Sequence, residues 1–187
     1  MWLQHRSYRG RPIRTPLNWI NTPWTGRLAV SARPRGGDWL ADDLKAWREA
    51  GATVIVSLLE VQESTDLGLE DEPMAAKISG LQFISFPIED RNVPASTDAA
   101  HEVLNQLNVL LKEGASILIH CRQGVGRSGL VAIALLIQAG KRVGEAIEIV
   151  GAARGLLVPE TAEQLAWLEV YEAQRALYLG HGSKPES

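Results

Sequence analysis

One segment, residues 117–139, constrains the fold of this chain more than any other. Residues 117–119 have the apolar pattern of a buried strand in a parallel sheet. A glycine-rich turn follows at 124–129, and residues 130–139 are apolar on almost every side, as in a central helix. The amide groups of such a turn converge, and the start of the helix adds partial positive charge. Strand, turn and helix together therefore predict an anion-binding site.

Strands and helices alternate along the rest of the chain. Strands are predicted from short apolar runs, and helices from apolar residues at helical spacing between capping and terminating residues. This alternation is typical of an α/β fold with a mostly parallel central sheet flanked by helices. The predicted strands are 28–31, 54–59 and 83–86, and the predicted helices are 38–51, 71–79, 96–114, 144–154 and 159–178.

Composition excludes several classes of protein. The longest apolar run, Leu130 to Ile137, is far shorter than the roughly 18–20 residues of a membrane span. A net charge of −3 gives no reason to expect a nucleic-acid partner. No group of His, Asp, Glu or Cys has metal-ligand spacing, so we expect neither metal nor cofactor. A single cysteine cannot form an internal disulfide and fits a reducing, cytoplasmic setting, while the oligomeric state stays open.

The first residues differ from the rest of the chain. Residues 1–35 contain seven arginines and no carboxylate, so the remainder is strongly acidic. We interpret residues 1–26 as an irregular basic extension and residues 27–187 as a single domain. Large aromatic side chains usually bury area, so we expect Trp19 and Trp24 to dock on the acidic body. Binding of nucleic acid or lipid by this extension is the less favoured interpretation.

The turn also contains groups for covalent chemistry. Cys121 stands at the end of the predicted strand, facing the positive cradle, which should stabilise its thiolate as a nucleophile. Arg127 carries a guanidinium whose fork matches two oxygens of a phosphate. An inert core cysteine is the alternative, but a loop suited to bind anions argues against it. A thiolate and an arginine at one anion site favour phosphoryl transfer to sulfur.

A dinucleotide-binding site is a competing interpretation of the same turn. Residues 124–129 read G-x-G-x-x-G between a strand and a helix, and Glu148 lies at a suitable distance. That fold requires a further strand to carry the acid, and more strand–helix units after it. The residues after Gly129 look helical, so we reject the cofactor interpretation.

The pattern His120-Cys121-x5-Arg127-Ser128 resembles the H-C-x5-R-[ST] signature of cysteine-based protein tyrosine phosphatases. It is most similar to the small dual-specificity branch, particularly its cyclin-dependent-kinase-associated members. The resemblance covers about residues 27–175. Residues 86–94 resemble the acid loop of that family, and residues 155–165 resemble its glutamine loop. A metal-free α/β phosphatase that acts on phosphoproteins is what the resemblance implies.

Roles for single residues also follow from the resemblance. Cys121 would attack phosphorus, and Asp90 would protonate the leaving oxygen and later activate water. Ser128 would donate to the sulfur and ease its departure. The side chain of Arg127 and the loop amides would hold the phosphate. The predicted substrate-binding residues are Arg122, Gln123, Gly124, Val125, Gly126 and Arg127.

Two supporting residues are implied as well. His120 would orient the loop from behind, and Gln164 would position the hydrolytic water. Glu160 departs from the family pattern, because many relatives have a glutamine there.

Simpler structural roles compete with several of these assignments. Asp90 could cap a turn, and Glu89 is its nearest competitor as the acid. Glu60 and Glu63 could brace Arg127, although solvated loop carboxylates are the favoured interpretation. Arg122 and Gln123 serve substrate binding or solubility about equally well.

The expected substrate is a phosphotyrosine protein, with phosphoserine and phosphothreonine as further candidates. A phosphoinositide or other non-protein phosphatase is the alternative, because fold does not fix substrate. A silent phosphate-binding module is the third reading, but a pure binder needs neither thiol nor acid.

Overall fold

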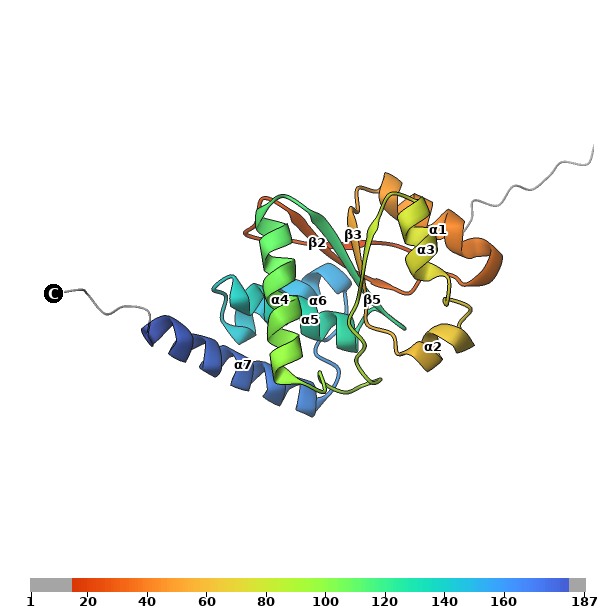
Figure 1. Ribbon diagram of the computed structural model, residues 1–187. Helices are drawn as coiled ribbons and strands as arrows, with labels where there is room; N and C mark the ends of the chain where they lie inside the picture. Colours follow the sequence, from red (N-terminus) through yellow and green to blue (C-terminus); the bar gives the residue numbers. More distant parts are fainter. Residues whose placement is uncertain (1–14, 182–187) are drawn as a thin grey trace, which may run out of the picture.

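The computed structural model describes residues 15–181, and its centre is a five-stranded sheet in the order β1-β2-β5-β3-β4. The β1–β2 pairing is antiparallel, and the other three pairings are parallel. Helices lie on both faces of the sheet (Figure 1). The predicted α/β class with a mostly parallel sheet is therefore confirmed. The strands are β1 (Asn18–Ile20), β2 (Arg27–Ala32), β3 (Val54–Ser57), β4 (Gln82–Ser85) and β5 (Ser116–Cys121).

The predicted helices are present with shifted ends. The helix after the turn begins at Gly126, earlier than predicted, and the last begins at Ala162, later than predicted. One six-residue helix, α2, was not predicted, because its polar sequence has no apolar periodicity. The helices are η1 (Gly37–Trp39), α1 (Leu40–Glu49), α2 (Val61–Asp66), α3 (Glu72–Ile78), α4 (Thr97–Lys112), α5 (Gly126–Gln138), α6 (Val143–Arg154) and α7 (Ala162–His181).

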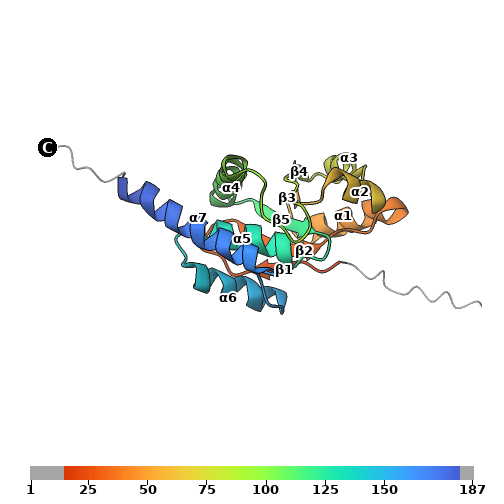
Figure 2. The same cartoon turned by 90° about the horizontal axis from the view of Figure 1, so that it is seen from below.

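Alternation along the central strands divides the core into two layers. Val54 and Val56 of β3 face one apolar cluster, and Ile55 between them faces the other. The first cluster contains side chains from α4, α5, α6 and α7, and the second contains side chains from α1 and α3. Figure 2 shows these two groups of helices on opposite sides of the sheet. Period-two alternation thus fixes which face each strand residue covers.

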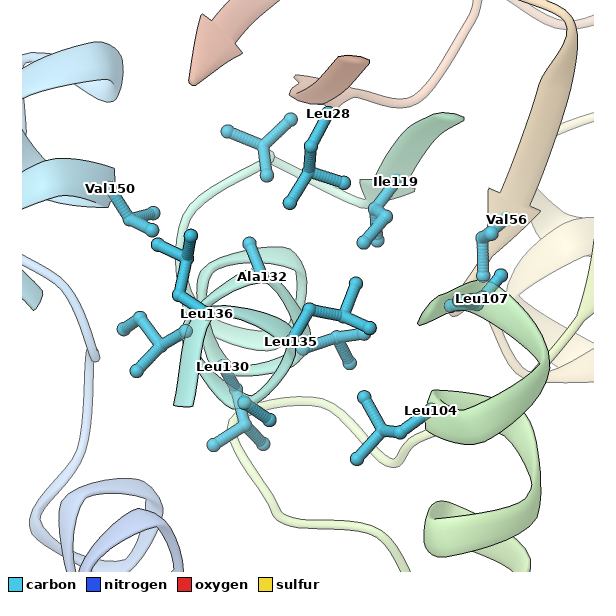
Figure 3. Packing of buried hydrophobic residues seen from close by; sticks show 14 of the residues in the cluster. Leu28, Val56, Leu104, Leu107, Ile119, Leu130, Ala132, Leu135, Leu136 and Val150 are labelled. Atoms are coloured by element: carbon cyan, nitrogen blue, oxygen red, sulfur yellow. The ribbon is translucent and has the colours of Figure 1, made fainter. Parts of the chain in front are cut away.

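Helix α5 is the centre of the larger layer. All its residues from Gly126 to Ile137 are buried. Its leucines pack against strand residues such as Ile119 and against Leu104 of α4 (Figure 3). The start of this helix is therefore held by the core. Within the described part of the chain, no helix has the length and apolarity needed to cross a membrane.

The prediction that residues 1–26 are irregular is wrong for their last part, because β1 joins the sheet there. A three-residue strand beside prolines is too short to show a period. The docking of the tryptophans is confirmed: Trp19 packs on the second cluster, and the Trp24 Nε1 group donates to Asn108 Oδ1 of α4 at 2.9 Å. The Arg27 guanidinium lies 3.6 Å from the centre of the Trp19 ring. Residues 1–14 lie outside the described residues, so the domain boundary at residue 26 stays a prediction.

Candidate active site

Cys121 ends β5, and the backbone curls around its sulfur before α5 begins. The Gly124 amide donates to Cys121 Sγ at 3.3 Å. Gly124 has a φ of +70°, and a Cβ built on it would lie 2.3 Å from the carbonyl carbon of Ser31 in β2. Only glycine tolerates both this conformation and this close approach. The cysteine loop (residues 121–128) is thus shaped by its contact with the neighbouring strand.

The sulfur lies inside the protein with a second donor beside it. Cys121 is only 3% exposed, and Ser128 is fully buried. The Ser128 Oγ atom lies 3.5 Å from Cys121 Sγ, within hydrogen-bond distance for sulfur. The first turn of α5 therefore places a hydroxyl beside the thiol, and the donation expected of Ser128 stays a prediction.

Arg127 is buried with its guanidinium held in place on several sides. Its Nη1 donates to Glu63 Oε2 at 2.6 Å and to the Ile88 carbonyl at 3.0 Å, and its Nη2 donates to Glu63 Oε1 at 3.0 Å. Burial opposes the charge, but the hydrogen bonds to Glu63 and the nearby charges of Cys121, Glu63 and Asp90 raise the pKa of Arg127 overall. The guanidinium is a fixed positive group beside the sulfur.

Glu63 corrects one sequence interpretation. It was expected to be a solvated loop carboxylate, but it forms a two-pronged ion pair with Arg127. Its hydrogen bond to Arg127 is the main reason that the pKa of Glu63 is lowered, against the opposing effect of burial. Glu60 instead caps α2, in a capping box with Glu63. Glu63 therefore serves both the helix start and the arginine.

Asp90 lies at the mouth of this site. Its Oδ1 atom is 2.9 Å from Arg127 Nη2, although the side chain is 57% exposed. The competing acid, Glu89, accepts a hydrogen bond from the Asn92 side chain instead. The structure thus brings Asp90, and not Glu89, to the arginine and the cysteine.

A cavity of about 110 Å³ lies between these groups. It contains the sulfur, the guanidinium and the Asp90 carboxylate, together with the exposed side chains of Arg122 and Gln123. Of the predicted substrate-binding residues, Gly124 and Val125 are not among its lining residues. The lining residues are Asp90, Arg91, Cys121, Arg122, Gln123, Gly126, Arg127 and Glu160.

His120 lies behind the cysteine loop, in the position that the sequence suggested. It is fully buried, and its ring centroid lies 5.8 Å from that of Trp47. Its Nε2 atom is 2.9 Å from Oε1 of Glu72, which is also buried. Sequence reasoning missed Glu72, because a carboxylate in the first turn of a helix ordinarily faces solvent.

Gln164 is fully buried and lies outside the cavity lining. Its Oε1 accepts from the Glu160 amide at 3.1 Å, and its Nε2 donates to the Asn92 carbonyl at 3.1 Å. Both ends of its amide are therefore bound to backbone. This arrangement favours support of the acid loop (residues 86–94) over direct contact with water in the cavity.

Arg154 also acts on the cysteine loop, and sequence reasoning missed it. Its Nε donates to the Gly124 carbonyl at 2.6 Å, and its Nη2 donates to the Gln123 carbonyl at 2.9 Å. The peptide plane that carries the Gln123 carbonyl also carries the Gly124 amide, which donates to Cys121 Sγ on its other side. An arginine in the last turn of a helix is normally expected to interact with the helix dipole, so its position in the sequence offered no reason to place Arg154 at the cysteine loop.

Comparison with known proteins agrees with this geometry. The family model described as "Polymorphic toxin system, DSP-PTPase phosphatase" matches residues 29–141. Mouse dual specificity protein phosphatase 2 is 30% identical over 78 residues, covering 41% of this chain and 24% of that protein. Rat cyclin-dependent kinase inhibitor 3 is 33% identical over 95 residues, covering 50% of this chain and 44% of that protein. The chain thus aligns with less than half the length of these curated relatives.

Solved structures share the fold over nearly the whole described chain. A kinase-associated phosphatase with its catalytic cysteine changed to serine has a TM-score of 0.79 at 20% identity, covering 88% of this chain and 98% of that one. Tk-PTP in its active form has a TM-score of 0.70 at 29% identity, covering 84% and 97%. The family model spans more than half of the chain, and the predicted resemblance is confirmed. The chain belongs to the DSP-PTPase phosphatases, a small dual-specificity branch of the cysteine-dependent phosphatases.

Proposed function

We propose that this chain is a phosphoprotein phosphatase that works through a cysteinyl-phosphate intermediate. The observation that carries the proposal is one small cavity lined by Cys121, Arg127 and Asp90. A thiol, a fixed guanidinium and an exposed carboxylate are the nucleophile, the anion ligand and the proton donor that a phosphate monoester requires.

In the first step the Cys121 thiolate attacks phosphorus, and the phosphorus–oxygen bond of the ester breaks. Asp90 transfers its proton to the leaving oxygen, so the alcohol departs neutral. The Gly124 amide and the Ser128 hydroxyl both lie within hydrogen-bond distance of the sulfur and stabilise its negative charge. The buried start of α5 adds partial positive charge in the same place.

In the second step water attacks the cysteinyl phosphate. Asp90, now ionised, takes the proton from the water, and the sulfur–phosphorus bond breaks to release inorganic phosphate. The sulfur departs as a thiolate, and the Ser128 hydroxyl donates to it as its charge returns. Both steps therefore use Cys121, Asp90 and Ser128, and Asp90 gives a proton in the first step and takes one in the second.

Phosphate recognition rests on Arg127 and on the backbone of the cysteine loop. Glu63 holds the Arg127 guanidinium in place, so the guanidinium reorganises little when it binds the phosphate. Arg154 holds the Gln123 and Gly124 carbonyls and so steadies the peptide plane whose Gly124 amide donates to Cys121 Sγ. Arg122 and Gln123 present exposed side chains at the mouth, where they contact the rest of the substrate.

We propose phosphotyrosine proteins as substrates, with phosphoserine and phosphothreonine also accepted. The name of the mouse relative, a dual specificity protein phosphatase, supports a protein substrate. PTPMT1 in complex with PI(5)P shares the fold, with a TM-score of 0.69 at 18% identity, so a phosphoinositide is the alternative. Asp90 and Glu160 pair with two of the three arginines in the lining, Arg127 and Arg91, which reduces the positive charge available to a headgroup with several phosphates. The proposal includes a cytoplasmic setting, in which the thiol stays reduced.

A panel of substrates tests this function. Parent protein and Cys121→Ser would be assayed on an aryl phosphate, on peptides phosphorylated at Tyr, Thr or Ser, and on phosphoinositides. We expect turnover of the aryl phosphate and the phosphotyrosine peptide by the parent alone, with phosphate-ester binding kept in the variant. Parent-like turnover by Cys121→Ser would refute the covalent mechanism. Selective turnover of phosphoinositides would favour the alternative, and binding without turnover by the parent would favour a silent module.

A further inference from the structure

An ion pair joins the acid loop to the segment before α7. Arg91, directly after the proposed acid, donates from Nη1 to Glu160 Oε1 at 3.0 Å. Both residues line the cavity. Two loops that lie far apart in the sequence are therefore tied together next to the proposed acid Asp90.

Arg91 has an unusual backbone for its residue type. Its φ is +61°, and it is the one described non-glycine residue with a positive φ. Left-handed conformations are unfavourable for arginine and persist where surrounding contacts hold them, often at functional sites. The side-chain bond to Glu160 is one such contact, since it fixes the far end of the same residue.

Two further contacts follow the same path. Thr161 Oγ1 lies 3.5 Å from the Arg91 carbonyl, and Gln164 Nε2 donates to the Asn92 carbonyl at 3.1 Å. Residues 91 and 92 are thus bound at side chain and backbone by residues 160–164. Asp90 itself is 57% exposed, so little packing restrains it directly.

We propose that the Arg91–Glu160 ion pair, together with these two backbone contacts, positions Asp90 for proton transfer. Arg91 and Glu160 are positioning residues, because they act through the carboxylate of Asp90. This inference rests on the proposed function, in which Asp90 is the general acid.

The expected effect is moderate, because the pair is exposed. The side chains of Arg91 and Glu160 are 64% and 37% exposed. An exposed ion pair changes an equilibrium by a factor of up to about five. We therefore expect a three- to tenfold loss of kcat with poor leaving groups when the pair is broken, including the loss of its help to the two backbone contacts. Added salt should lower the kcat of the parent with poor leaving groups toward that of the variants.

The experiment uses a series of aryl phosphates whose leaving groups differ in pKa. The parent would be compared with Arg91→Ala, Arg91→Gly, Glu160→Ala, Glu160→Gln and the double alanine variant. Arg91→Gly removes the side chain while relieving the left-handed strain, so it stays informative where alanine lowers stability. Lys141→Ala is the matched control, because it breaks the solvent-accessible ion pair between Lys141, just before α6, and Glu145 in the first turn of that helix.

The two single alanine changes alter cavity charge in opposite directions, which separates positioning from simple electrostatics. We expect both to lower kcat for poor leaving groups and to leave good leaving groups unchanged, with no further loss in the double variant. Glu160→Gln, which keeps an acceptor for Arg91, should recover part of the rate. Opposite effects on KM with an unchanged dependence on leaving group would overturn the inference.

The parent and Cys121→Ser, run on the same series, keep the two proposals distinguishable. Loss of turnover in Cys121→Ser with parent-like behaviour of the Arg91 and Glu160 variants would reject the positioning role alone. Parent-like turnover in Cys121→Ser would reject the proposed function, and the positioning role with it. Lys141→Ala should match the parent throughout, and a similar loss there would identify a general effect of surface charge.

Discussion

The two sides of the proposed active site are built in different ways. The cysteine loop is buried: Cys121 is 3% exposed and Arg127 is 1% exposed. Backbone contacts with β2 and the core helix α5 hold it from behind. The opposite side consists of Asp90, Arg91 and Glu160, which are 57%, 64% and 37% exposed. One side is therefore held by packing, and the other by ion pairs in contact with solvent.

This difference separates what binds from what transfers protons. A phosphate site needs convergent amides and a fixed cation, and a close-packed interior holds such groups with little reorganisation. A proton donor must reach leaving groups of varied shape and exchange protons with water, which suits an exposed loop. We therefore expect changes on the buried side to affect every substrate, and changes on the exposed side to depend on the leaving group.

The largest expected effect lies on the exposed side, and it tests whether an exposed residue can contribute strongly to the rate. Asp90→Asn should slow poor leaving groups by about 10²- to 10⁴-fold, because only these need the proton. Good leaving groups should be slowed far less. Parent-like rates with poor leaving groups would transfer the acid role to Glu89.

A change on the buried side should be less selective. Arg127→Lys keeps the charge but loses the two-pronged fork, and we expect kcat/KM to fall by about 10²- to 10³-fold for all substrates. Steady-state kinetics on good and poor leaving groups would measure this. A loss confined to poor leaving groups would remove the contrast between the two sides.

Glu63→Gln sharpens the comparison through pH. The pKa of Glu63 is lowered by Arg127, so its carboxylate stabilises the folded state above the unfolded pKa of about 4.5. That stabilisation is lost as the pH falls through the lowered folded value. We expect the variant to be about 1–3 kcal/mol less stable near neutral pH.

Denaturant unfolding from pH 7 to pH 3 would measure this difference. The stabilities of parent and variant should converge as the pH falls. A difference that does not change with pH would contradict the ionic role of Glu63.

The smallest effect should come from the N-terminal segment, which is far from the acid loop in the sequence. Trp24→Phe removes the donor to Asn108 and should lower the free energy of unfolding by about 1 kcal/mol. Activity on an aryl phosphate should be unchanged. Asn108→Ala should cost a similar amount, and the double variant little more than either single change. Additive losses would show that the two side chains stabilise the fold independently.

Local patterns in the sequence predict the buried side well. The strand, turn and helix around Cys121 are contiguous, so their spacing alone predicts an anion site. Gly124 and Ser128 lie in the same motif. The central strands and α4 also follow, because apolar periodicity and the Ser96 cap are local signals.

Contacts between distant segments could not be predicted in the same way. Glu63 is 64 residues from Arg127, and Arg154 is 30 residues from Gly124. Neither separation produces a periodic pattern in the sequence, and an isolated charged residue most often faces solvent. Strand β1 was missed for a related reason, since its three residues are ordered by pairing with β2 and not by their own pattern.

The contact between Asp90 and Arg127 has a consequence for the binding of substrate and the release of product. One arm of the guanidinium is already occupied by a carboxylate at 2.9 Å. An incoming phosphate must displace this internal competitor, so binding is an exchange of one anion for another. At the end of the proposed cycle Asp90 carries the proton taken from the water, so it competes with inorganic phosphate only after that proton has left. We therefore expect the ionised Asp90 carboxylate to weaken retention of the product and to help empty the cavity for the next turnover.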